Sequence, residues 1–171
     1  MYEKFGQFID GKWQASSNKE TYEVINPANE EVIGLASKAT PEDVDRALKS
    51  AEKGLEVWKK TSPWKRSSVI RKIADLIRAK QDVLAKWLTL EVGKPFLEGK
   101  GEVGATADIF EWNSEETKRI YGQTVESRFE DTRIHVYYQP IGVVAAMSPW
   151  NFPLVLSCLL YTSDAADEHT G

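Results

Sequence analysis

An apolar run that leads into a loop with two prolines constrains the fold of this chain more than any other stretch. Residues 141–147 read Ile-Gly-Val-Val-Ala-Ala-Met, and residues 148–153 read Ser-Pro-Trp-Asn-Phe-Pro. The apolar run is typical of a strand that is covered on both faces in a parallel α/β sheet. Pro149 and Pro153 cannot extend that strand, so we expect a stiff turn between them. Because parallel sheets bind ligands at the carboxyl ends of their strands, this turn is the candidate site.

The composition is that of a globular protein and excludes several classes of partner. The 171 residues are 42% hydrophobic and 28% charged, with a formal net charge of -4. The charges are interspersed and form no basic stripe, so we expect no nucleic-acid partner. The N-terminus lacks a signal pattern, and no apolar run approaches the roughly 20 residues that span a bilayer. We therefore expect a cytoplasmic protein without a membrane partner.

Two short strand pairs are expected near the N-terminus. An Asp-Gly pair at positions 10 and 11, between apolar flanks, predicts a tight hairpin. Residues 22–25 and 31–36 lie on either side of an Asn-Pro turn and predict a second strand pair. Farther along, residues 124–130 and 133–139 predict an exposed hairpin, whose free edge needs a partner.

Helical spacing begins at Thr40, where a capping hydroxyl precedes Pro41. A second helix starts at Ser62-Pro63, a third stops at Gly93, and a fourth covers about residues 97–121. The residues expected to face the core are Val44, Ala47, Leu48, Ala51, Leu55 and Trp58 in the first helix, Val69, Ile70, Ile73, Ala74 and Ile77 in the second, and Val103, Ala107, Phe110, Ser114, Thr117 and Tyr121 in the fourth.

Two common catalytic motifs are absent from this sequence. It contains no phosphate-binding Gly-x-x-x-x-Gly-Lys-Ser/Thr and no Gly-x-Ser-x-Gly. His135 and His169 are too few and too far apart for a metal site, and a single cysteine, Cys158, excludes a multi-cysteine site. We therefore expect no metal.

Two interpretations of Asn151 remain open from the residues alone. Its amide can satisfy backbone groups within a structural turn, as asparagine often does. It can also present an N–H into a crevice at the edge of the sheet, where a neutral donor stabilises a developing oxyanion.

Several motifs in this chain resemble the NAD(P)-dependent aldehyde dehydrogenase superfamily, in the order and at the spacing found there. A narrower resemblance, to the succinate-semialdehyde dehydrogenase branch, lies in residues 111–122. The motifs are Phe8-Ile9-Asp10-Gly11-Lys12-Trp13, Asn26-Pro27, Thr40-Pro41-Glu42-Asp43-Val44, Glu91-Val92-Gly93-Lys94-Pro95, and Ser148-Pro149-Trp150-Asn151-Phe152-Pro153 with Tyr138-Gln139-Pro140-Ile141-Gly142-Val143 before it.

The resemblance implies an α/β fold, an incomplete Rossmann-like cofactor domain with an N-terminal helical region and a protruding β-hairpin. In this family a cysteine thiolate attacks the aldehyde, hydride passes to NAD or NADP, and a glutamate activates the hydrolytic water. By resemblance, Asn151 contributes to the oxyanion hole, and Met147, Ser148, Pro149, Trp150 and Asn151 line the nicotinamide part of the cofactor site.

The resemblance also divides the chain into four parts. Residues 1–122 are expected to be the N-terminal part of the cofactor-binding domain, and residues 123–140 a hairpin that joins the copies of a homo-oligomer. Residues 141–157 are expected to be the first strand and the active-site loop. Residues 158–171 are expected to be a non-native tail, because residues 158–168 resemble the translation of a transposase-type sequencing-library adapter.

The catalytic cysteine and glutamate of the family are expected to lie outside this sequence. Cys158 follows Asn151 by only seven positions, whereas the family nucleophile comes from a distant catalytic domain, so Cys158 is not expected to be the nucleophile. The full-length protein is therefore predicted to oxidise an aldehyde, such as succinate semialdehyde, through a cysteine thiohemiacetal, and this chain to be inactive. The alternative is a non-catalytic assembly module in which residues 148–153 are only a turn.

Overall fold

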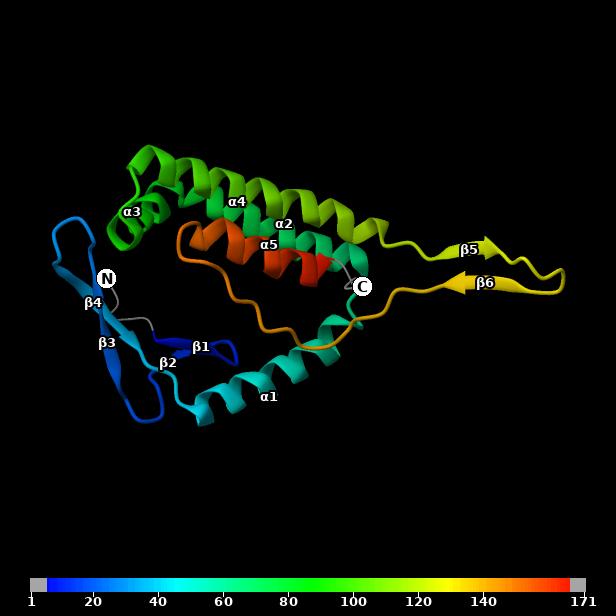
Figure 1. The fold of residues 1–171 in the computed structure, drawn as a ribbon, viewed down its shortest axis with the longest axis horizontal. Helices are drawn as coiled ribbons and strands as arrows, with labels where there is room; N and C mark the ends of the chain where they lie inside the picture. Colours follow the sequence, from blue (N-terminus) through cyan, green and yellow to red (C-terminus); the bar gives the residue numbers. More distant parts are fainter. Residues whose placement is uncertain (1–5, 167–171) are drawn as a thin grey trace. The chain divides into compact units, whose positions relative to one another are not determined.

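The computed structural model describes residues 6–166, with side chains as far as residue 160, and divides into two compact units. One unit contains Met1–Lys60 and Lys80–Gly104, and the other contains Thr61–Ala79 and Ala105–Gly171. The elements in chain order are β1 (Gln7–Ile9), β2 (Lys12–Gln14), β3 (Thr21–Ile25), β4 (Val32–Ser37), α1 (Pro41–Trp58), α2 (Pro63–Ala79), α3 (Gln81–Val92), α4 (Phe96–Glu116), the 3₁₀ helix η1 (Thr117–Arg119), β5 (Gln123–Glu126), β6 (Arg133–Val136) and α5 (Pro153–Ala166) (Figure 1).

This mixture of helices and strands is a partial α/β fold, which confirms the predicted class. The described strands form three separate antiparallel pairs, β1 with β2, β3 with β4, and β5 with β6. Each predicted hairpin is therefore present. Within residues 6–166, no helix is long and apolar enough to cross a membrane.

The β1–β2 hairpin has the turn that its Asp-Gly pair predicts. Asp10 and Gly11 have φ angles of 55° and 72°, the left-handed values that a primed two-residue turn requires at both central positions. The turn places Phe8 opposite Trp13, with ring centroids 5.1 Å apart.

The Asn-Pro turn between β3 and β4 closes on itself and contacts the end of α3. The Asn26 side chain accepts a hydrogen bond from the backbone N–H of Ala28 at 3.0 Å. Gly93 ends α3 with a φ of 78°, and a Cβ atom on it would lie 2.9 Å from Cγ of Pro27. Glycine is therefore required here both by its backbone conformation and by the close approach of the turn.

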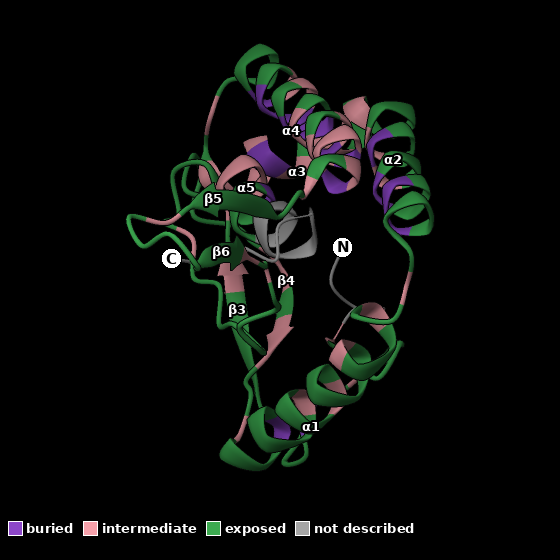
Figure 2. Cartoon of the chain, turned by 90° about the vertical axis from the view of Figure 1, so that its right-hand side faces the viewer, coloured by how far each residue is buried: buried purple, intermediate pink, exposed green. Residues whose placement is uncertain are grey.

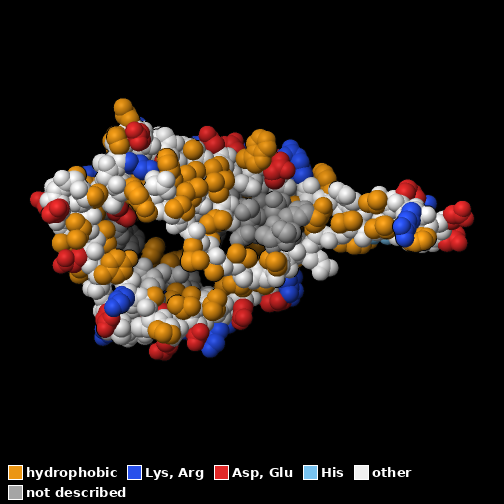
Figure 3. Space-filling model, viewed as in Figure 1, with side chains coloured by type: hydrophobic (Ala, Val, Ile, Leu, Met, Phe, Trp, Pro, Cys, Tyr) orange, Lys and Arg blue, Asp and Glu red, His pale blue; other side chains and the backbone are white. Residues whose placement is uncertain are grey.

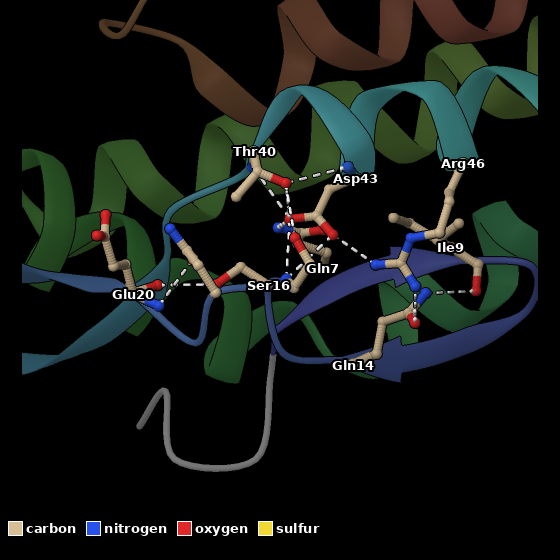
Figure 4. Close-up of polar contacts among 10 residues, drawn as sticks. Gln7, Ile9, Gln14, Ser16, Glu20, Thr40, Asp43 and Arg46 are labelled. Carbon is tan, nitrogen blue, oxygen red and sulfur yellow. Dashed lines mark hydrogen bonds and ion pairs between the residues drawn. The ribbon is translucent and has the colours of Figure 1, made fainter.

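Asp43 anchors the first turn of α1 to the strands before it (Figure 4). Its carboxylate, in a residue that is 1% exposed, accepts hydrogen bonds from the backbone N–H of Thr40 at 3.0 Å, the side-chain amide of Gln7 at 3.2 Å and the backbone N–H of Ser17 at 3.2 Å. Arg46 forms an ion pair with the same group. The Thr40 hydroxyl accepts from the N–H of Asp43 in return, which completes a capping box.

The hydrogen bond from Thr40 holds the pKa of the Asp43 carboxyl well below its usual range. Burial acts in the opposite direction, and Arg46, Gln7 and Ser17 add to the lowering. The charged carboxylate is thus the form that the fold favours.

The predicted burial of the apolar face of α1 is wrong in this chain. Val44 and Leu48 are 50% and 47% exposed, Ala51 is exposed, and Ala47, Leu55 and Trp58 are only half-buried. Figure 2 shows α1 mostly in the exposed colour, whereas α2 and α4 carry buried stripes. The physical reason is that, among the described residues of the first unit, the element packed most closely on α1 is β1, and a three-residue strand cannot cover an 18-residue helix.

The first unit buries its core between α3 and the start of α4. Ala85, Leu88 and Val103 are buried there, and Gly99 allows the two helices to approach closely, since a Cβ on it would lie 3.0 Å from the carbonyl oxygen of Ala85. An ion pair joins the almost fully buried side chains of Lys94 and Glu102. Removing either partner would take the ion pair away from a buried charge and should destabilise this unit.

The second unit packs α2 against the rest of α4. Ile70, Ala74, Ala107 and Phe110 are buried as predicted, together with Ser114 and Thr117, whereas Val69 is 42% exposed. On the outside of this pair, Arg71 contacts Glu111 at 2.9 Å and Arg78 contacts Asp108 at 2.7 Å. The fourth helix ends earlier than predicted, because η1 tightens the chain after Glu116 and leaves Tyr121 exposed.

The apolar run at 141–147 is not a buried strand in this chain, contrary to the prediction. The structure assigns it no strand hydrogen bonding, and all seven of its residues are exposed. A parallel strand needs neighbours from distant parts of a sequence, and the described residues offer it none.

The buried carboxylate of Asp43 predicts how the stability of the chain depends on pH. Because its folded-state pKa is below the ordinary value of 3.8, its contribution is fully present above about pH 4 and is lost as the pH falls through the lower folded-state value. We expect Asp43→Asn to lower the urea midpoint of unfolding at pH 7. Below pH 4, this midpoint should fall less steeply with pH in the variant than in the unsubstituted chain. The matched change of the exposed Asp45 to Asn should alter neither. If the urea midpoint of Asp43→Asn fell below pH 4 as steeply as that of the unsubstituted chain, this role would be contradicted.

Candidate functional site

The predicted site loop lies directly before the helix α5. Residues 150–152 form a turn, Pro153 is the first residue of the helix, and the N–H of Leu156 donates to the carbonyl oxygen of Phe152 at 3.1 Å. This confirms the stiff turn expected from the two prolines. Met147 and Trp150 are 87% and 78% exposed, and Asn151 is also exposed.

A hydroxyl pair joins the start of the loop to α5. Oγ of Ser148 and Oγ of Ser157 lie 2.8 Å apart, at hydrogen-bonding distance. The sequence analysis missed Ser157, because nine residues separate it from Ser148. Pro153 could have indicated this contact. A proline at the first helical position marks the start of a helix, and the first turns of that helix lie beside the loop that precedes it.

The side chains of the loop can donate hydrogen bonds, but they cannot perform acid–base chemistry. Residues 147–153 contain no acidic, basic or thiol side chain. Their polar groups are the Ser148 hydroxyl, the Trp150 indole N–H and the Asn151 amide. The hydroxyl of Ser148 faces another serine rather than a base, so nothing there activates it as a nucleophile. The loop is therefore suited to stabilising charge rather than to attacking a substrate.

Cys158 is placed as a structural residue, in agreement with its exclusion as the nucleophile. It is 3% exposed, and its thiol donates to the backbone carbonyl of Thr106 in α4 at 3.5 Å. A reactive thiol requires access for the reagent, and the burial of Cys158 denies that access.

The described residues do not enclose a dinucleotide. The predicted cofactor residues, from Met147 to Asn151, follow an exposed segment, and no neighbouring strand forms an opposing wall. A hollow of about 470 Å³ lies elsewhere in the second unit, at the base of the β5–β6 hairpin. Its lining includes the ion pair between Glu116 and Arg119 as well as Ile120, and contains none of the predicted site residues.

No group of three or more His, Cys, Asp or Glu side chains within residues 6–166 is arranged to hold a metal ion. His135 lies in β6, exposed, with Nδ1 3.1 Å from the hydroxyl of Thr124 on the opposite strand. His169 lies outside the described residues.

The comparisons with known proteins agree on one family. A family model described as "Aldehyde dehydrogenase family" matches residues 13–162, which include the first five residues of the expected non-native tail, 158–162. Glutarate-semialdehyde dehydrogenase of Pseudomonas aeruginosa is 43% identical over 146 residues, which are 85% of this chain and 30% of the relative. Succinate-semialdehyde dehydrogenase [NADP(+)] GabD of Escherichia coli is 40% identical over 148 residues, which are 86% of this chain and 31% of the relative.

A solved structure resembles the fold closely. The crystal structure of succinate-semialdehyde dehydrogenase from Burkholderia pseudomallei matches with a TM-score of 0.89 and 37% identity, over 94% of this chain and 33% of that one. This chain thus spans about a third of the length of the relatives that it matches.

The burial of the single cysteine gives a direct test of this part of the fold. Cys158 should react slowly with a thiol reagent in the native chain and rapidly in urea, because its thiol lies between α5 and α4. The measurement is the rate of labelling, followed by mass spectrometry. Equal rates in the two conditions would contradict the described packing of α5.

Proposed function

This chain belongs to the aldehyde dehydrogenase family, and we propose that the full protein oxidises an aldehyde to a carboxylate with NAD or NADP as hydride acceptor. The observation that carries the proposal is the family match over residues 13–162, which contains the Asn151 loop. The relatives named above act on semialdehydes, and residues 111–122 resemble that branch. We therefore propose a semialdehyde, such as succinate semialdehyde, as the substrate.

The role proposed for Asn151 follows from the chemistry of its loop. An aldehyde carbonyl that is attacked by a nucleophile becomes an oxyanion, and a neutral amide N–H stabilises that charge without being consumed. Asn151 lies in a turn held between Pro149 and Pro153, so its amide can be oriented before the substrate arrives. Met147, Ser148, Pro149 and Trp150 would form the neighbouring wall for the nicotinamide.

The nucleophile and the general base are proposed to come from the part of the protein outside this sequence. The loop supplies neither, and Cys158, the single cysteine, is buried against Thr106. The chain of 171 residues should therefore be catalytically silent. The thiohemiacetal step, in which a cysteine sulfur bonds to the aldehyde carbon, belongs to the full protein.

The β5–β6 hairpin is proposed to join copies of the full protein. Val125, Ile134 and Tyr137 are exposed on or beside its strands, and Phe129 is exposed in its turn. Figure 3 shows hydrophobic side chains along the surface of this hairpin. An exposed edge with apolar side chains is the kind of surface that proteins cover by association. The cytoplasmic location expected from the sequence stays a prediction.

Substitution of Asn151 tests the proposed chemistry in the full protein. Asn151→Ala should lower kcat for aldehyde-dependent NADH or NADPH formation by about 10²- to 10³-fold, as the loss of one oxyanion donor does. KM should change much less, because the donor acts mainly in the transition state. Asn29→Ala, which removes an exposed amide from the β3–β4 turn, is the matched control and should retain full activity. Wild-type rates in Asn151→Ala would overturn the assignment.

Sequencing of the source DNA tests whether residues 158–171 are native. We expect the true reading frame to leave the present one at the Ser157 codon and to continue into segments that carry a cofactor-binding lysine, a glutamate and a cysteine. A native read that continues through Cys158-Leu159-Leu160 would reject the adapter interpretation. A frame that extends without a later cysteine and glutamate would favour the non-catalytic assembly module.

A further inference from the structure

Helix α1 presents an apolar stripe that the first unit leaves uncovered. Val44, Leu48, Ala51 and Leu55 follow one another at steps of four, three and four residues, so they lie on one face. The first three are exposed and Leu55 is half-buried. Charged residues lie at other positions around the helix, among them Asp45, Lys49, Glu52 and Lys53.

The stripe belongs to a helix that is fixed in place at its N-terminal end. The Asp43 carboxylate ties the first turn of α1 to Gln7 in β1 and to the backbone of Ser17. Val44 follows Asp43 directly, so the anchored turn also sets the direction of the apolar face. A surface that is oriented in advance loses less conformational freedom when a partner binds to it.

Among the described residues of the first unit, β1 is the element that packs most closely on α1, but it has only three residues and contacts the helix at its first turn, through Gln7 and Asp43. Figure 3 shows hydrophobic side chains at the surface over α1. Isolated exposed apolar residues need no explanation, but a continuous stripe along an anchored helix is typical of a surface that packs against another layer.

The relatives are long enough to supply such a layer. The matched region is 30% of the Pseudomonas aeruginosa enzyme and 33% of the Burkholderia pseudomallei structure, so about two thirds of each protein lies outside it. The match to the Burkholderia pseudomallei structure leaves out 6% of this chain, which is a shorter stretch than the 18 residues of α1. At least part of α1 therefore has a counterpart in that enzyme.

We propose that the stripe of Val44, Leu48 and Ala51 is an internal docking surface for the portion of the protein that follows residue 157. The inference rests on the proposal that the full protein is longer than this chain. It is independent of catalysis, because it concerns packing of the full protein and not the chemistry at Asn151.

Cysteine footprinting tests this proposal. Leu48→Cys and, separately, Val44→Cys are placed in the Cys158→Ser variant of this chain and in the full protein, and each substituted peptide is monitored by mass spectrometry after thiol labelling. Lys49→Cys is the matched control, since Lys49 is exposed and lies next to Leu48 on the polar side of the helix. Leu88→Cys, at a buried position of the first unit, should label slowly in this chain and reports that the unit carrying α1 is folded.

We expect both stripe positions to label rapidly in this chain. In the full protein, where labelling would require local opening, the rate should be lower by at least about tenfold. Lys49→Cys should label rapidly in both. Rapid labelling of the stripe in the full protein would overturn the proposal, because the face would then be free. Slow labelling already in this chain would also overturn it, since another part of the chain or a second copy would be the cover. An inactive full protein with a protected stripe would reject the proposed function and leave this inference intact.

Discussion

A β-strand is stable only when its backbone N–H and C=O groups are paired, and this requirement determines which parts of the chain form regular structure. The three sheets in residues 6–166 are local hairpins or short strand pairs, whose partners follow within a few residues. The apolar run at 141–147 has no such neighbour in this part of the chain. It is therefore exposed, although its composition is that of a buried strand. The local part of the fold forms from this sequence, and the non-local part does not.

The difference between local and non-local structure also explains how much could be predicted. The Asp10-Gly11 turn, the Thr40-Pro41 helix start and the Gly93 stop depend on residues within one turn, and the structure confirms all three. The burial of Val44 and Leu48 could not be inferred, because periodicity shows which face of a helix is apolar but not whether another layer covers it. The bond between Ser148 and Ser157 was missed for a related reason, since it depends on where α5 begins relative to the loop.

The candidate site also has a local part, which forms in this chain, and a non-local part, which does not. The sequence predicted a stiff turn around Asn151, and the structure confirms the turn at the start of α5. The prolines and the Ser148–Ser157 contact hold this loop locally, so an oxyanion donor could be oriented without the rest of the protein. The cofactor wall could not form in the same way, because it requires the neighbouring strands of a parallel sheet. Family membership supports the proposed chemistry, and the geometry accounts for why one part of the site stands alone.

Amide hydrogen exchange of Val143 to Met147 tests this account most directly. The account predicts rapid exchange in the chain of 171 residues, where the run is unpaired, and strong protection in the full protein, where neighbouring strands would take up its backbone groups. The amides of β3 and β4 serve as the internal reference, because they are paired in this chain already. Protection of residues 143–147 in the short chain, or rapid exchange of the same residues in the active full protein, would contradict it.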